Sequence, residues 1–135
     1  MERLYNSSFS NTSKYFLWYI SYNYENNSAT IYYGTNKLYR SVDRAVNWTR
    51  ISDDLTDGLH PSGSASFGTI TTIAPAPSDS ETIYVGTDDG LIQVSEDGGA
   101  NWRTEDKFKG VPDMSLVEDI IPSSHDENVA YAVFD

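Results

Sequence analysis

Short apolar and β-branched runs, separated by clusters of Asn, Asp, Gly, Pro and Ser, recur along the whole chain. Runs of this length and composition are typical of strands, and the polar clusters are typical of turns. The predicted strands are 15–22, 30–33, 37–41, 48–51, 69–74, 82–86, 91–95, 102–104, 115–121 and 129–134. Helical periodicity is essentially absent, so the pattern predicts an all-β fold.

The strand pattern repeats with nearly constant spacing. Residues 31–35 (IYYGT) match residues 83–87 (IYVGT), and 130–132 occupy the same place in a third copy. The turns 41–48 (SVDRAVNW) and 95–102 (SEDGGANW) both fit Ser-x-Asp-x-x-x-Asn-Trp, and their tryptophans are 54 residues apart. A period of ~50 residues with four short strands is the signature of β-propeller blades. We therefore expect four-stranded antiparallel blades.

The repeat divides the chain into segments. They are an N-terminal arm (1–14), blade 1 with its box turn (15–52), a connecting loop (53–68), blade 2 with its box turn (69–104), a second connecting loop (105–114) and the start of blade 3 (115–135). This amounts to about two and a half blades. Because a propeller closes only with about four to eight blades, we expect an incomplete propeller and a fragment of a larger protein.

The two turns resemble the Asp-box, or BNR repeat, written Ser-x-Asp-x-Gly-x-x-Trp. The second copy has every residue of that pattern, and the first has Ala45 where Gly is expected. The matching residues are Ser41, Asp43, Trp48, Ser95, Asp97, Gly99 and Trp102. Such boxes occur in sialidases, sortilin-type receptors and xyloglucan-cleaving glycoside hydrolases. From Ile20 onward the chain is most similar to large bacterial proteins described as sortilin-like or glycosyl hydrolase-like.

The chemistry of the second box turn predicts a structural role. Asp97 can accept hydrogen bonds from backbone N–H groups across the turn. Gly98 and Gly99 can take positive φ without strain, and Trp102 offers a large apolar surface. We expect Asp97→Ala to lower stability without affecting binding. Because Ala45 lacks the freedom of glycine, we expect the first turn to bend differently.

Asp88 is the candidate catalytic residue. Xyloglucan-active relatives carry a catalytic Asp in Tyr-x-x-Thr-Asp-x-Gly-Gly, and residues 84–91 match this stretch up to Leu91. The resemblance implies that Asp88 is one carboxylate of the pair that glycoside hydrolysis needs. An ordinary Asp-Asp-Gly hairpin turn explains the same residues. The first copy has Asn36 and Lys37 at this place, so no matched pair exists within the chain.

Aromatic residues are concentrated in the first blade. Flat rings stack on sugar rings, so Trp18, Tyr22 and Tyr33 are candidates for carbohydrate stacking. Packing in the core or under a hairpin is the alternative for the same residues.

The composition excludes several kinds of partner and site. The formal charge is −11, from 20 acidic and 9 basic residues, so a phosphate backbone would be repelled and nucleic acid is not expected. There are no cysteines, and the two histidines have no ligating companions, so neither a metal site nor a cofactor is expected. The longest apolar stretch, 15–20, is too short for membrane insertion. No signal peptide is recognised at the N-terminus. The compartment stays open, with an extracytoplasmic or secreted longer parent as the alternative considered.

Two functions remain after these exclusions. The first is a non-catalytic part of an Asp-box propeller that serves as a scaffold or binds a carbohydrate or protein ligand. The alternative is a fragment of a glycoside hydrolase, xyloglucanase-like or sialidase-like, whose active site is completed by missing blades or another subunit. The expected partner is the remainder of a larger propeller or further copies of the chain.

Overall fold

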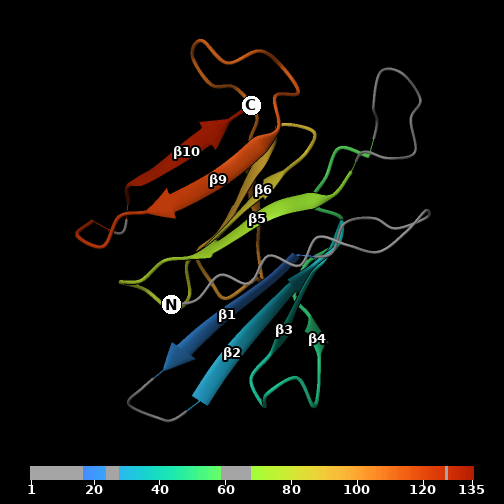
Figure 1. Ribbon diagram of the computed structural model, residues 1–135, viewed down its shortest axis with the longest axis vertical. Coiled ribbons are helices and arrows are strands. Elements are labelled where there is room, and N and C mark those ends of the chain that lie inside the picture. Colours follow the sequence, from blue (N-terminus) through green and yellow to red (C-terminus); the bar gives the residue numbers. More distant parts are fainter. Residues whose placement is uncertain (1–16, 24–27, 59–67, 127) are drawn as a thin grey trace.

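The computed structural model describes residues 17–23, 28–58, 68–126 and 128–135, with side chains from residue 30 onward. In this part of the chain, β-strands form three antiparallel sheets and no helix occurs (Figure 1). The all-β prediction is therefore confirmed, and each predicted strand overlaps an observed one.

Strands within each sheet follow the order of the chain, so neighbouring strands are joined by hairpins. The first sheet contains β1 (Leu17–Asn23), β2 (Ser28–Gly34), β3 (Leu38–Ser41) and β4 (Thr49–Arg50). The second contains β5 (Ile70–Pro75), β6 (Ile83–Thr87), β7 (Ile92–Ser95) and β8 (Arg103–Glu105). The third contains β9 (Val117–Pro122) and β10 (Ala130–Phe134).

The second and third sheets share one register. Tyr84 lies opposite Ala74 in the second sheet, and Tyr131 lies opposite Ile121 in the third. Both sheets also have a register shift in their first strand. The extra residue of that strand comes directly after Ile70 in β5 and directly after Val117 in β9. Such bulges are specific features of a strand pair. Residues 130–134 are therefore the structural equivalents of residues 83–87.

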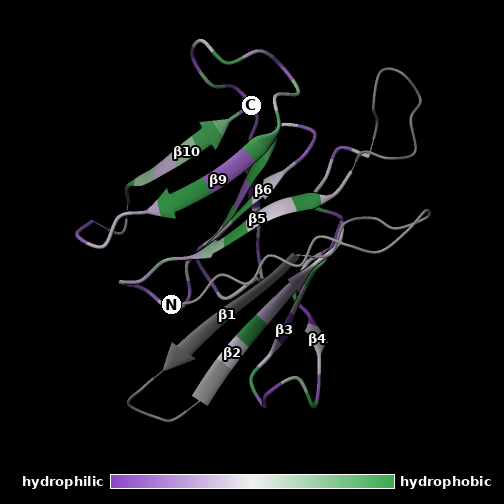
Figure 2. Ribbon diagram, in the orientation of Figure 1, coloured by the Kyte–Doolittle hydropathy of each residue, from purple (hydrophilic) through white to green (hydrophobic). Residues whose placement is uncertain are grey.

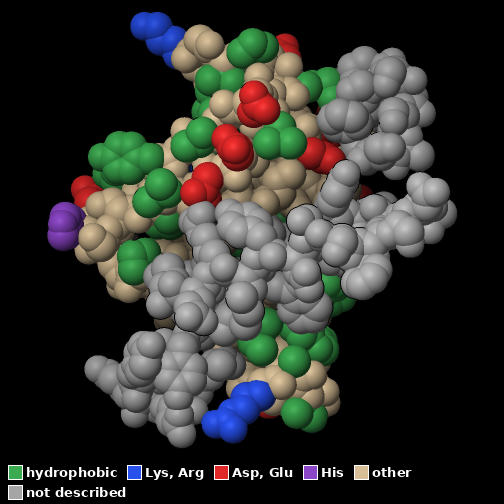
Figure 3. Space-filling model, viewed as in Figure 1, with side chains coloured by type: hydrophobic (Ala, Val, Ile, Leu, Met, Phe, Trp, Pro, Cys, Tyr) green, Lys and Arg blue, Asp and Glu red, His purple; other side chains and the backbone are tan. Residues whose placement is uncertain are grey.

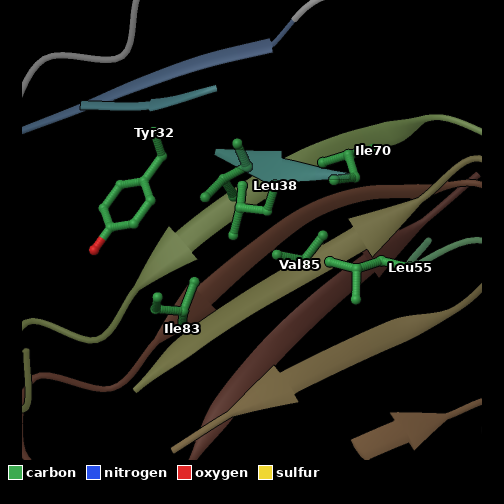
Figure 4. Packing of buried hydrophobic residues seen from close by; sticks show 7 residues of the cluster. Tyr32, Leu38, Leu55, Ile70, Ile83 and Val85 are labelled. Atoms are coloured by element: carbon green, nitrogen blue, oxygen red, sulfur yellow. The ribbon is translucent and has the colours of Figure 1, made fainter. Parts of the chain in front are cut away.

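One hydrophobic cluster joins the first two sheets. Tyr32 and Leu38 from the first sheet pack with four residues of the second sheet and with Leu55 of the loop that follows β4 (Figure 4). The four residues of the second sheet are Ile70, Ile73, Ile83 and Val85. Leu38, Ile83 and Val85 are fully buried, so this cluster excludes water from the junction.

A second cluster joins the second sheet to the third. Val117 and Ile120 of β9 pack with Ala74, Tyr84, Ile92 and Val94 on the opposite face of the second sheet, and with Ala76, which follows β5. Figure 2 shows β9 with hydrophobic ends around a hydrophilic middle and β10 as mainly hydrophobic. A Cβ on Gly86 would lie 2.5 Å from Cγ1 of Val117, so glycine is needed for this close approach.

Candidate functional site

The second box turn, residues 95–102, is closed by hydrogen bonds between its own residues. Ser95 Oγ donates to Asp97 Oδ1 at 2.9 Å and accepts from the Gly99 N–H at 2.8 Å. Asn101 donates from its backbone N–H to Asp97 Oδ1 at 2.8 Å and from Nδ2 to Oδ2 at 2.7 Å. Donation from Asn101, and then from Ser95, holds the pKa of Asp97 below its ordinary value. The carboxylate therefore stabilises the turn.

The first box turn, residues 41–48, repeats these bonds. Ser41 Oγ donates to Asp43 Oδ1 at 2.9 Å, and Asn47 donates to both carboxylate oxygens at 2.8 and 2.7 Å. Backbone and side-chain donation from Asn47 lowers the pKa of Asp43. Ala45 donates to Ser41 Oγ at 2.9 Å, as Gly99 does to Ser95.

Ala45 keeps the first turn in the same left-handed region as the second, with a smaller φ than its equivalent Gly99. Ala45 has φ 66° and Arg44 has φ 60°, whereas Gly98 and Gly99 have φ 69° and 97°. The hydrogen bonds hold the first turn in the left-handed region, although its residues have side chains. A non-glycine residue there is strained by about 1–2 kcal/mol.

The asparagine before each tryptophan was not assigned a role from the sequence. Asn47 and Asn101 each supply two of the donors to the box carboxylate. Their recurrence at one position of both copies was the available signal.

The two box tryptophans have different surroundings. Trp102 packs against the cluster between the first two sheets, and its indole N–H donates to the carbonyls of Ile51 at 3.0 Å and Gly99 at 3.1 Å. Trp48 is 37% exposed, and its ring meets that of Tyr33 edge-on with centroids 6.1 Å apart. Trp102 thus links two sheets, whereas Trp48 packs on its own sheet.

Asp88, the candidate catalytic residue, is buried at the turn between β6 and β7. Its Oδ1 accepts the backbone N–H groups of Gly68 at 2.9 Å and Thr69 at 2.8 Å. Burial raises the pKa of Asp88, and the bonds from Thr69 and Gly68 oppose this only partly. The carboxylate fastens the start of β5 to this turn.

Asp89 forms further hydrogen bonds at the same turn. It accepts a hydrogen bond from the Thr87 hydroxyl and one from the backbone N–H of Asp57 at 2.7 Å. The corresponding turn of the first sheet has only Asn36 between Thr35 and Lys37, and Asn36 Nδ2 donates to Asp54 Oδ2 at 2.6 Å. Asp89 was not singled out from the sequence because its partner Asp57 is 32 residues away.

The candidates for carbohydrate stacking are only partly described. Trp18 and Tyr22 lie in β1, opposite Tyr33 and Ala29 in the register, and their side chains lie outside the described residues. Tyr33 is partly buried, and its ring lies 6.0 Å from that of Tyr39. Burial, and then Tyr39, raise the pKa of Tyr33. Tyr33 therefore belongs to a cluster with Tyr39 and Trp48.

An open groove of about 530 Å³ lies between the end of the first sheet and the second box turn. It is lined by Ile51, Asp53, Leu55, Asn101, Trp102 and Thr104, among others. Gln93 bridges its two sides, donating to the Leu55 carbonyl at 2.9 Å and accepting from the Thr104 hydroxyl at 2.8 Å. The groove is lined by carboxylate, amide, hydroxyl and indole groups, and the Trp102 N–H, the Gln93 amide and the Thr104 hydroxyl already bond within the chain.

Two further kinds of site were sought. Among the described residues, no group of three or more His, Asp or Glu side chains is arranged to hold a metal ion. In the same part of the chain, no helix has the length and hydropathy needed to cross a bilayer.

Comparison with protein-family models, with curated proteins and with solved structures finds no match to this chain.

Proposed function

We propose that the chain is a non-catalytic part of an Asp-box β-propeller that serves as a scaffold and binds a carbohydrate or protein ligand. In this proposal the three sheets are two blades and the first half of a third. The remaining blades come from a larger propeller or from further copies of the chain.

One observation carries the non-catalytic assignment. The carboxylates singled out from the sequence, those of Asp43, Asp88 and Asp97, all accept hydrogen bonds from nearby turn or backbone groups. A general base must be within reach of a substrate proton, and a carboxylate engaged in holding a turn is poorly suited to that task. Stabilisation of the blades accounts for these acids without a reaction.

The groove beside the second box turn is the place where a ligand would bind. Trp102 supplies an aromatic ring, while Asp53 and Arg50 supply charged groups that are largely exposed. Planar polar groups next to a ring fix the orientation of a small polar ligand such as an oligosaccharide. Gln93 of β7 holds the two sides together, because it bonds to Leu55 in the loop that follows β4 and to Thr104 in β8.

Titration of the ¹⁵N-labelled chain with xyloglucan and sialylated oligosaccharides tests whether the groove binds a carbohydrate. Binding should shift amide signals around Trp102, and Arg50→Ala or Asp53→Ala should weaken it by about fivefold or more. Asp113→Ala is the matched control, because Asp113 is an exposed acid paired with Lys107 outside the groove. Shifts elsewhere, or equal effects of the control, would exclude the groove as the site.

The second candidate is a fragment of a glycoside hydrolase whose active site is completed by missing blades or another subunit, and the burial of Asp88 favours it. A general acid at neutral pH needs a raised pKa, which is the direction found for Asp88. Hydrolysis of the same oligosaccharides by the chain, abolished in Asp88→Asn with the fold intact, would establish this function. A lower melting temperature of Asp88→Asn, with no hydrolysis by the unsubstituted chain, would support the structural role of Asp88.

A further inference from the structure

Aspartate is followed directly by glycine at three places in the sequence, and such a pair can modify itself. The backbone nitrogen of the residue after an aspartate can attack the side-chain carboxyl carbon. Glycine favours this attack, since it has no Cβ beside the nitrogen and restricts the backbone least. The two reacting atoms must also reach the right distance and alignment, so the fold decides which pair reacts. The three pairs are Asp57 with Gly58, Asp89 with Gly90 and Asp97 with Gly98.

Asp97 and Gly98 are held in an unreactive arrangement. Asn101 donates to both carboxylate oxygens of Asp97, at 2.8 and 2.7 Å, and Ser95 Oγ donates to Oδ1. The attacking nitrogen is engaged as well, because the Gly98 N–H donates to the Glu81 carbonyl at 2.9 Å. The bonds from Asn101 and Ser95 lower the pKa of Asp97, so its uncharged acid, the form that loses water readily, is scarce. Several hydrogen bonds would have to break before an attack.

Asp89 and Gly90 are buried and held in a similar way. Asp89 accepts a hydrogen bond from the Thr87 hydroxyl on one oxygen, and one from the Asp57 N–H at 2.7 Å on the other. A Cβ on Gly90 would lie 2.9 Å from Met114 Cα, so the neighbouring backbone leaves little space for the turn to rearrange. This pair therefore lacks the freedom that the reaction needs.

Asp57 and Gly58 differ from both of these pairs. The two residues are exposed, and within the described residues neither the Asp57 carboxylate nor the Gly58 N–H has a bonding partner. Gly58 has φ 69°, and a Cβ there would meet nothing within 4 Å in the same part of the chain. The bond from the Asp57 N–H to Asp89 fixes neither of the reacting atoms.

Exposure alone does not single out Asp57. Exposed acidic side chains are common on this chain, and Figure 3 shows several of them on one face. Among the three Asp-Gly pairs, a free carboxylate, an unhindered nitrogen and open space occur together at Asp57 and Gly58.

We propose that Asp57 is a site of spontaneous modification, at which a succinimide forms with Gly58 and then opens to isoaspartate. The Gly58 nitrogen bonds to Asp57 Cγ while the Cγ–O bond of the acid breaks, and the departing O–H takes the N–H proton to leave as water. Water then adds to either ring carbonyl. Opening at the main-chain carbonyl gives isoaspartate, and opening at Cγ restores aspartate.

The modification changes the chain locally. Isoaspartate adds a methylene group to the backbone between Asp57 and Gly58 and leaves the original main-chain carboxyl free. The Asp57 N–H lies before this bond, so it can still donate to Asp89, and Leu55 should keep its contact with Gln93. The reaction uses only the chain and water, so it does not depend on a ligand in the groove.

Incubation of the folded chain in mildly acidic buffer, below its melting transition and followed by peptide mapping, tests the proposal. The succinimide is identified by the loss of water, and isoaspartate by its unchanged mass and its resistance to an aspartate-specific protease. Both should accumulate at Asp57 at least about tenfold faster than at Asp89 or Asp97, whose hydrogen bonds must break first. In urea, where these bonds are lost, the three pairs should react at similar rates.

Two substitutions at the exposed pair test the chemistry. Asp57→Glu keeps the charge but would require a larger ring, and it should abolish the modification at this position. Gly58→Ala places a Cβ beside the attacking nitrogen and should slow the reaction several-fold. Both positions are exposed, and thermal melting checks that the variants fold.

Asn101→Ala is the matched test of protection by hydrogen bonds, because it removes the Nδ2 donor to Asp97. Isoaspartate at Asp97 should then form about fivefold faster, while the rate at Asp57 stays the same. Equal rates at the three pairs in the folded chain would overturn the proposal. So would the absence of reaction at Asp57 under conditions in which the chain in urea reacts. The variants of Asp57 and Gly58 keep the test valid even if Asn101→Ala alters the fold.

Discussion

The two box turns have the same internal hydrogen bonds in different surroundings. In both, a serine hydroxyl and an asparagine hold one aspartate, with matching distances within 0.1 Å. The second turn also contacts the first sheet, because Trp102 donates to Ile51 and Arg40 donates to the Gly98 carbonyl at 3.4 Å. In the first turn Val42 and Val46 are 67% and 75% exposed. The turn is thus a local structure, and its contribution to packing depends on the neighbouring sheet.

The largest difference is expected between the two tryptophans. Trp102→Ala removes packing and an N–H that links two sheets, and should lower the free energy of unfolding by about 3 kcal/mol. Trp48→Ala should cost about half of that or less, because its ring is more exposed. Urea denaturation measures both. Equal losses would show that the neighbouring sheet adds little to the second turn.

The glycine of the second turn and the alanine of the first should respond in opposite directions. A Cβ on Gly99 would lie 2.8 Å from the Ile51 carbonyl oxygen at φ 97°, so Gly99→Ala should cost about 2 kcal/mol. Ala45→Gly relieves strain at φ 66° and should stabilise by about 0.5 kcal/mol after the entropy of glycine is included. The same denaturation series tests both. Destabilisation by Ala45→Gly would contradict the strain at this position.

The smallest expected effect is the change with pH in the stability that Asp97 and Asp88 contribute. The pKa of Asp97 is lowered on folding, so its stabilisation is present above the ordinary pKa and is lost as the pH falls through the folded value. The pKa of Asp88 is raised on folding. The contribution of Asp88 to stability therefore falls as the pH rises from its ordinary pKa through its pKa in the folded state. Asp97→Asn should therefore destabilise the chain more at about pH 7 than at about pH 3. Asp88→Asn should destabilise it less at about pH 7 than at about pH 3. Melting curves at the two pH values provide the measurement, with parallel behaviour of the variants as the contrary result.

Much of the fold could be predicted because its determinants are local. The strands follow from short apolar runs between turn residues, and the box hydrogen bonds join residues two and four positions apart. The role of Asp97 therefore follows from the sequence around it. The role of Asn101 could have been read from the same short segment.

Other features depend on contacts between residues far apart in the chain. The sequence made Asp88 a candidate catalytic residue or part of an ordinary hairpin turn. The structure has it accept hydrogen bonds from the amides of residues 68 and 69, about twenty positions earlier. The groove exists only because the loop after β4 lies against the second box turn. No local pattern encodes either arrangement.

The sequence by itself determined the strands, their order and the closure of the two box turns, because these depend on side-chain alternation and on bonds within a few residues. The tertiary structure decided which surfaces are covered. Tyr84 is 8% exposed and its equivalent Tyr131 is 67% exposed, although both occupy the same place in the repeat. The difference arises because β9 covers the face of Tyr84, and burial is a property of neighbouring sheets that a single repeat does not contain.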